Sequence, residues 1–312
     1  MRLRAQMLQD IRRFFADRNV LEVETPILGN AIGTDPQLAF FETEYAQSPL
    51  RRTLFLQTSP EFAMKRLLAA GSGSIYQICK AFRQGESGRF HNPEFTMLEW
   101  YRVGFDLAQL MDEVDELISL LFKKHGLIAT QRVSYQTIFQ KHTGLNPLQF
   151  CHQDYSRFAV DGGWPEAINI CGQDPVLWLD FLFSHAVQPR LGEQGLVMVY
   201  GYPACQSSLA RINEQNPAIT DRVELFLNGV ELGNGYYELT DAREQNARFD
   251  REISFRLTRG LPAPTKDEHL IAALSSGLPP CSGIAIGLDR LLMLLSDGKT
   301  IADVLSFPVD MA

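Results

Sequence analysis

The chain has 312 residues, 45% of them apolar, which is enough to bury a core in one large domain or two modest ones. Its 29 basic and 37 acidic side chains give a formal charge of -8, which disfavours dedicated nucleic-acid binding. No apolar run reaches about 18 residues, and the first residues lead into a mixed-charge helical pattern and not into a secretion signal. We therefore expect no membrane span and a cytoplasmic location. The five cysteines lack any metal-binding spacing, which indicates reduced thiols.

The first third of the chain begins with a helical pattern. Apolar residues at helical spacing predict an amphipathic helix over 4–18, followed by a strand over 20–24. Ser59 precedes Pro60 as an N-cap precedes a proline at the first helical position, so we expect a second helix over 61–70.

Two β-prone runs then suggest a hairpin with a long loop. The runs cover 75–83 and 93–102, and the polar segment 84–92 separates them. A helix over about 106–124 follows. Because these strands are consecutive and joined by a loop, we expect them to pair in the antiparallel sense.

The second half of the chain begins with weak signals over 130–195, which we interpret as a peripheral insertion. A buried strand over 196–202 follows, then a hairpin over 223–232, and last a glycine-rich strand, 283–287, that leads directly into a helix. Hairpin-linked strands with helices grouped at intervals predict an α+β fold, an antiparallel sheet flanked by helices. No linker marks a boundary, so we expect a single domain over 1–312.

The hairpin over 223–232 carries the most informative pattern. A type I′ turn at Asn228 and Gly229 pairs residue 227 with 230, 226 with 231, and 225 with 232, which puts Glu224, Phe226 and Glu231 on one face. The two carboxylates are then diagonal neighbours that can converge on Mg²⁺. A merely solvated acidic face is the alternative.

Further chemistry-bearing residues lie near the ends of predicted elements. Glu238 follows two glycines that allow close approach of a ligand. Glu61 begins its helix, where a favourable interaction of its negative charge with the helix dipole is an alternative role. Arg83 closes a strand and can fork onto a phosphate, although a strand-end arginine is often just solvated. Arg290 lies in the first turn of a helix, where its charge opposes the dipole and indicates another role.

Together these segments resemble the three signature motifs of class II aminoacyl-tRNA synthetases, in the lysine branch. The match spans nearly the whole chain. The segments that carry it are 21–26 for the first motif, 82–83 with 89–95 for the second, 287–290 for the third, and 58–61, 92–101, 231–235 and 238–241 for the lysine branch.

The expected absence of one domain separates two groups within this family. Bacterial lysyl-tRNA synthetases carry an amino-terminal OB-fold for the anticodon, and here the first motif begins at about residue 4, so no such domain is expected. The chain is most similar to the elongation factor P lysine ligases, stand-alone paralogues that attach (R)-β-lysine, and α-lysine more weakly, to a lysine of elongation factor P. The resemblance implies ATP and Mg²⁺ as cofactors, no tRNA partner, and a homodimer formed through residues 4–26.

The resemblance also assigns roles to individual residues. Arg83 and Arg290 are the implied catalytic residues: Arg83 holds the α-phosphate, and the adenine lies between Phe95 and Arg290. Glu224 and Glu231 are the implied Mg²⁺ ligands. The other implied ATP contacts are Gln84, Gly85, Asn92, Phe95, Leu232 and Gly287, and the implied amino-acid contacts are Ser59, Pro60, Glu61, Tyr101, Asn234, Glu238 and Ala285.

Two departures from the family pattern bear on the site. The glutamate that usually stands two residues after the motif 2 arginine is absent, and Glu86 stands one residue further on. Ala285 replaces a glycine common in lysyl-tRNA synthetases, and its methyl group can shift the preference between α- and β-amino isomers. Two other functions remain open, a minimal tRNA-charging enzyme and a non-catalytic regulatory paralogue.

Overall fold

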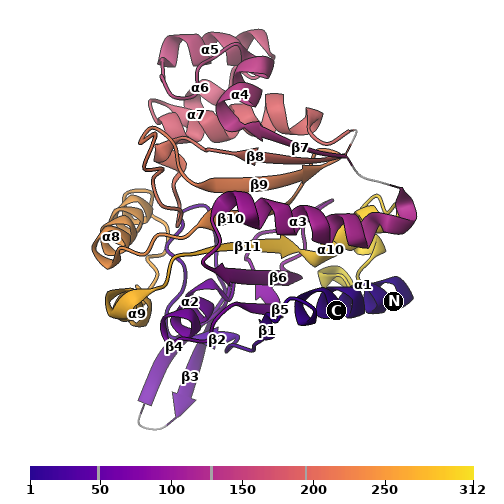
Figure 1. The fold of residues 1–312 in the computed structure, drawn as a ribbon. Helices are drawn as coiled ribbons and strands as arrows, with labels where there is room; N and C mark the ends of the chain where they lie inside the picture. The colour runs from indigo at the N-terminus through magenta and orange to yellow at the C-terminus, as the bar shows by residue number, and fades with distance from the viewer. Residues whose placement is uncertain (48–49, 127–128, 194) are drawn as a thin grey trace. The chain divides into compact units, whose positions relative to one another are not determined.

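The structure is a computed structural model that describes residues 1–47, 50–126, 129–193 and 195–312 (Figure 1). The chain divides into two compact units. Unit 1 comprises Met1–Leu110 and Leu239–Ala312, and unit 2 comprises Met111–Glu238. The expected insertion over 130–195 falls in unit 2, apart from residue 194, which lies outside the described residues; a single domain stays a prediction.

Unit 1 holds the two termini of the chain. Its helices and strands are α1 (Arg2–Ala16), β1 (Leu21–Glu22), β2 (Leu28–Gly29), β3 (Glu42–Gln47), β4 (Leu50–Leu56), α2 (Glu61–Ala69), β5 (Ile75–Phe82), β6 (Glu94–Val103), α8 (Ala242–Thr258), α9 (Glu268–Gly277), β11 (Cys281–Gly287) and α10 (Leu288–Leu295). Two short 3₁₀ turns, η5 (Ile301–Asp303) and η6 (Val309–Met311), follow.

The strands of unit 1 run in the order β1-β5-β6-β11. β5 pairs with β6 in the antiparallel sense from Ile75 opposite Tyr101 to Phe82 opposite Glu94, which confirms the predicted long-looped hairpin. β11 pairs with the other edge of β6, also antiparallel. β1 pairs with β5 in the parallel sense, a pairing that the sequence did not indicate.

The amphipathic pattern of α1 buries one face of the helix in unit 1. Met7, Ile11, Phe14 and Phe15 are buried, and the Phe15 ring stacks on Tyr76 of β5 with 4.4 Å between ring centroids. The helix predicted over 4–18 is thus confirmed, two residues earlier in the chain. The strand expected over 20–24 shortens to two residues.

The start of α2 differs from the prediction. The first intrahelical bond runs from the Met64 N–H to the Pro60 carbonyl (3.0 Å), which makes Pro60 the N-cap and Glu61 the first helical residue. Ser59 as N-cap was therefore wrong by one position. Gly71 follows the helix at φ +86°, the left-handed conformation expected of a glycine just past a helix end.

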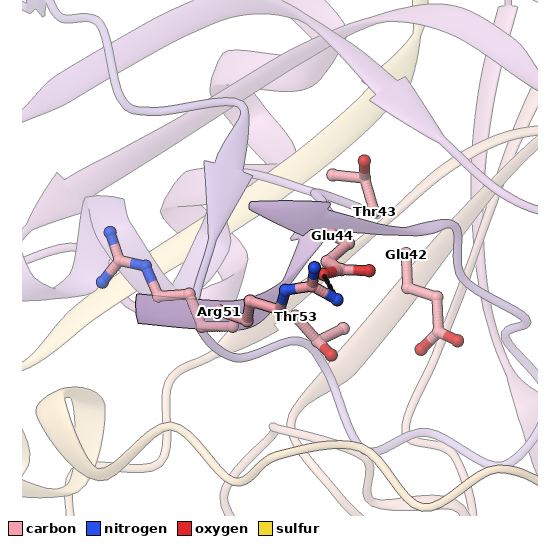
Figure 2. Close-up of a pocket in the computed structure, with 6 residues that line it drawn as sticks. Glu42, Thr43, Glu44, Arg51 and Thr53 are labelled. Carbon is pink, nitrogen blue, oxygen red and sulfur yellow. Dashed lines mark ion pairs between the residues drawn. The ribbon is translucent and has the colours of Figure 1, made fainter. Parts of the chain in front are cut away.

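A separate small sheet in unit 1 has the order β2-β4-β3, and Figure 1 shows the β3–β4 hairpin extending away from the other strands of the unit. An open pocket lies on this hairpin (Figure 2). Glu42, Thr43, Glu44, Arg51, Arg52 and Thr53 line it, and none of them is a predicted site residue.

Unit 2 contains the strands β10-β9-β8-β7, in that order, and the helices of the expected insertion. The boundary between the units falls within α3 (Leu107–Phe122). The remaining elements are β7 (Ala129–Ser134), α4 (Tyr135–Thr143), α5 (His152–Asp161), α6 (Ala167–Cys171), α7 (Pro175–Leu182), a π-helical turn (Phe183–Val187), β8 (Gly195–Tyr200), β9 (Arg222–Leu227) and β10 (Val230–Tyr237), with short 3₁₀ turns at Lys123–His125, Gln188–Arg190 and Ala204–Gln206.

The helices α4 to α7 form their own core in unit 2. Figure 1 shows them gathered beside β7 and β8. Trp178, Tyr135 and Phe139 are fully buried in a cluster that also takes Phe226 from β9. β7 and β8 pair in the parallel sense, so the expected antiparallel pairing is right for β8–β9 and β9–β10 and wrong for this edge.

The β9–β10 hairpin turns at Asn228 and Gly229, whose φ values of +52° and +72° suit a type I′ turn. Residues 227 and 230, and 226 and 231, pair as predicted. The predicted pairing of 225 with 232 is wrong, because a bulge between Glu231 and Gly233 puts Gly233 opposite Leu225. Glycine weakens a strand locally, which makes this a natural place for a bulge.

Within the described residues, no helix combines the length and the apolar content that a bilayer crossing requires. All five cysteines are free in the structure.

Candidate active site

The predicted site residues fall into two sets, one in each unit. Glu224, Glu231, Leu232, Asn234 and Glu238 lie in unit 2, and all the others lie in unit 1.

Arg83 follows the last residue of β5 and faces the start of β6. Its backbone N–H donates to the Pro93 carbonyl (2.9 Å), and its guanidinium lies 5.1 Å from the centroid of the Phe95 ring. Glu86 approaches the same guanidinium at 3.7 Å, so the displaced glutamate pairs with Arg83. The buried Nε of Arg83 has no hydrogen-bond partner among the described residues. An unused charged donor beside an aromatic ring suits a phosphate next to a base.

Arg290, in the first turn of α10, holds the loop between β5 and β6. Its Nε donates to the Phe90 carbonyl (3.1 Å), and a terminal nitrogen lies 2.6 Å from Nε2 of His91. Because arginine only donates, His91 accepts at Nε2 and keeps its proton on Nδ1. In the same loop, the Gln84 N–H donates to the Ala39 carbonyl (3.0 Å), and Gly85 adopts φ +80°.

β6 and β11 place Tyr101, Glu99, Ala285 and Gly287 side by side. The Tyr101 hydroxyl donates to the Glu99 carboxylate (2.6 Å), and both side chains are buried. Directly opposite on β11, Ala285 faces Glu99 and Gly287 faces Met97. The small residues therefore lie on the face that carries the buried carboxylate. Glu99 was not among the predicted site residues, although strand alternation from Tyr101 indicates it.

Glu61 already has a cationic partner inside the protein. Lys65, one turn along α2, donates to its carboxylate at 2.6 Å and is only 2% exposed. Lys65 was missed, although a lysine four residues after a glutamate on a helix is a readable signal. The pair fixes the Glu61 side chain, while Ser59 and Pro60 lie just before it.

Glu224 of unit 2 is buried beside an arginine. Arg222, two residues earlier on the same strand face, forms an ion pair with it and donates to the Gln206 carbonyl (2.7 Å). Burial raises the pKa of Glu224; the Arg222 charge opposes this rise and the Glu231 charge adds to it. The alternative of a solvated acidic face is wrong, since Glu224 and Phe226 are both buried.

The two carboxylates fit a hard cation that keeps its own water or phosphate ligands. Glu231 is near enough to Glu224 for its charge to add to the rise in the pKa of Glu224. Among the described residues, no group of three or more His, Cys, Asp or Glu side chains could hold a metal ion. Two carboxylates without a full protein cage suit Mg²⁺ in a nucleotide complex.

The remaining residues of unit 2 are placed along and just after β10. The Asn234 amide donates to the Tyr236 hydroxyl (3.2 Å), which in turn lies 3.4 Å from the Ser208 hydroxyl. Leu232 and Glu238 are each 1% exposed. Buried carboxylates such as Glu238 require compensating cations or donors.

Comparisons with known proteins agree with the sequence pattern. A family model for class II tRNA synthetases (D, K and N) matches residues 1–311. The chain is 43% identical over 316 residues to a protein of Hamiltonella defensa, and 44% identical over 313 residues to proteins of Salmonella arizonae and Enterobacter sp. (strain 638). Each alignment covers 99% of this chain and 94% of the relative. All three relatives are named elongation factor P–(R)-β-lysine ligase.

Proposed function

This chain belongs to the class II tRNA synthetase family, in the group that serves D, K and N, and on that basis we propose that it is an ATP-dependent ligase that joins (R)-β-lysine to elongation factor P. One observation carries the proposal: identity of 43% or 44% to ligases of that name extends over 99% of the chain. The unused Nε of Arg83 beside Phe95 supports ATP as the activating substrate.

The proposed reaction has two steps. The carboxylate of the amino acid attacks the α-phosphorus of ATP in line, the bond to the bridging oxygen breaks, and pyrophosphate leaves. A lysine amine of elongation factor P then attacks the adenylate carbonyl, an amide bond forms, AMP leaves, and the amine proton passes to solvent. Neither step needs a side-chain nucleophile, so positioning and charge neutralisation suffice.

In unit 1, Arg83 offsets negative charge on the α-phosphate, and the adenine lies between Phe95 and Arg290. Gln84, Gly85, Asn92 and Gly287 complete the ATP contacts of this unit. Glu61, held by Lys65, receives an ammonium group of the amino acid, and Ser59, Pro60, Tyr101 and Ala285 lie along the same substrate.

In unit 2, Glu224 and Glu231 hold Mg²⁺, and Arg222 fixes the Glu224 carboxylate for this role. When bound, Mg²⁺ neutralises phosphate charge. The backbone at Leu232 contacts ATP, Asn234 the substrate carboxylate, and Glu238 the side-chain ammonium. The enzyme acts as a cytoplasmic homodimer through α1 and β1 and does not charge tRNA.

The amino-acid preference is tested at Ala285, which faces Glu99 across the strand pair. Removing one methyl group from a close-fitting pocket changes discrimination by about tenfold or more. We expect Ala285→Gly to lower the ratio of (R)-β-lysine to α-lysine activation by that factor in ATP–pyrophosphate exchange.

Ala129→Gly, an exposed alanine on β7, is the matched control and keeps the wild-type ratio. An unchanged ratio in Ala285→Gly contradicts the role of the methyl group. Activation of neither isomer by the wild-type chain contradicts the proposed function itself and favours a regulatory paralogue.

A further inference from the structure

The C-terminal segment of unit 1 is attached to the loop between β5 and β6. We call residues 299–309 the strap. The Ile301 N–H donates to the Arg89 carbonyl (2.8 Å), and Nε of Arg89 donates to the Lys299 carbonyl (3.0 Å). The Val309 N–H donates to Oδ1 of Asn92 (3.0 Å). The attachments thus join two segments about two hundred residues apart in the chain, as the separation of 217 between Asn92 and Val309 illustrates.

The strap has internal order of its own. Thr300 and Asp303 form a capping box around η5, and the Asp303 carboxylate also accepts the Lys299 N–H (2.9 Å). Ile301 is 4% exposed. Arg4 of α1 donates to the Val304 carbonyl (3.3 Å). The strap is therefore held by contacts that do not involve the loop. A segment held in this way can fix a loop that it contacts.

The loop itself has few bonds of its own. Gly88 and His91 form one isolated bridge, and Arg290 holds Phe90 and His91 from α10. Asn92 donates to the Glu94 carbonyl (2.6 Å) while it accepts from Val309, so both ends of its amide are used. Asn92 is 8% exposed. These contacts fix the side chain of Asn92, which is itself a proposed ATP contact.

We infer that the strap is a positioning element for ATP, which fixes the loop 84–92 against Arg83 and Arg290 through the bond from Val309 to Asn92. The inference rests on the proposed function, because it assumes that this loop contacts the nucleotide. It makes ATP affinity depend on a backbone N–H that lies far from the loop in sequence. Val309 is 46% exposed, and its backbone N–H makes the attachment.

Proline at position 309 removes this one donor with little other change. Val309 is the first residue of η6, where the N–H is not needed for the helix, and Pro308 before it has φ -61° and ψ 161°, a conformation favoured before proline. Val309→Ala is the matched control, since it shortens the side chain and keeps the N–H.

We expect Val309→Pro to weaken ATP binding in calorimetry by roughly two- to tenfold, the effect of one hydrogen bond, while Val309→Ala binds as the wild type does. The KM for ATP rises with the KM for lysine unchanged, a split that a general loss of structure would not produce. Without ATP, amide hydrogen exchange in the loop 84–92 is faster in Val309→Pro than in Val309→Ala.

Val309→Pro has no further effect in an Asn92→Ala background, because the bond is already absent there. A chain that ends at Pro308 removes the same donor, and it replaces the proline variant should that variant fail to fold. Equal ATP affinity and equal amide exchange of the loop in the proline and alanine variants would contradict the positioning role of the strap. Failure of the wild-type chain to bind ATP overturns the proposed function instead.

Discussion

Asp289, Glu61 and Glu224 lie beside cations in buried or largely buried surroundings. Arg4 pairs with Asp289 in unit 1, Lys65 pairs with Glu61, and Arg222 pairs with Glu224 in unit 2. Removing one member of a buried pair costs about 3–5 kcal/mol, because the other charge is left without compensation. Two of these carboxylates are proposed ligand contacts, so their cations hold them in position before a ligand arrives.

Glu252 of α8 has a neutral partner. Its carboxylate accepts a hydrogen bond from the buried Thr34 hydroxyl. Burial raises the pKa of Glu252 from 4.5 to about 7; Thr34, Arg248 and Arg251 oppose the rise, and Asp35 adds to it. The folded protein therefore keeps a proton on Glu252 that the unfolded chain loses at lower pH.

This difference predicts a pH dependence of stability. Between pH 4.5 and about 7 the folded state binds more protons than the unfolded state, so the free energy of unfolding falls as pH rises. The fall attributable to Glu252 is at most about 3 kcal/mol. We expect Glu252→Gln to remove it, so that the variant gains stability relative to wild type across this window.

Urea unfolding at a series of pH values measures the effect. Glu44→Gln, whose side chain is 59% exposed on β3, serves as control and leaves the pH profile unchanged. Parallel profiles for wild type and Glu252→Gln would show that the folded protein does not hold this proton.

At the scale of elements, the β9–β10 turn is supported by the segment that precedes β8. The Asn228 N–H donates to the Gly192 carbonyl (3.0 Å), and the Gly229 N–H donates to the Leu191 carbonyl (2.7 Å). Gly192 has φ +77°, and a Cβ there would lie 2.7 Å from Cα of Leu227. Only glycine permits this approach, which holds the hairpin that carries Glu224 and Glu231.

A comparison of Gly192→Ala with Gly163→Ala separates the stability cost of steric overlap from the cost of left-handed backbone strain. Gly163 has φ +88°, and a Cβ added there would meet nothing within 4 Å, so its substitution costs only the left-handed strain of about 1–2 kcal/mol. Gly192→Ala adds overlap with backbone, which costs roughly 1–3 kcal/mol more. Urea unfolding compares the two, and equal losses of stability would mean that the turn moves away freely.

Local patterns in the sequence predicted the elements well. Asn228 with Gly229 indicated the turn and its first two pairs, and two β-prone runs separated by a polar segment indicated the β5–β6 hairpin. The bulge at Gly233 was not predicted, because a bulge depends on how both strands pack. The parallel pairing of β1 with β5 and of β7 with β8 joins segments that no local pattern links.

In the candidate site, too, local patterns indicate some residues and miss others. The family motifs predicted roles for Glu61 and Arg83, and the hairpin pattern pointed to Glu224. Spacing along one helix or strand could have indicated Lys65 and Arg222. The strap could not be found from the sequence, since its bonds to Arg89 and Asn92 run mainly through backbone atoms of a distant segment. Backbone donors carry no residue signature.

At the scale of the whole molecule, the similarity to the named ligases and the net charge are compatible. Alignment over 99% of the chain leaves little of it outside the shared family, and a charge of -8 offers no general attraction for a nucleic acid. A protein acceptor with an exposed lysine is consistent with both properties.

The most direct measurement is the intact mass of elongation factor P after incubation with this protein, ATP, Mg²⁺ and (R)-β-lysine, with bulk tRNA in a parallel reaction. We expect elongation factor P to gain the mass of one lysyl group only when ATP and enzyme are both present, and tRNA to remain uncharged. Charging of tRNA with no change in the mass of elongation factor P would contradict the account.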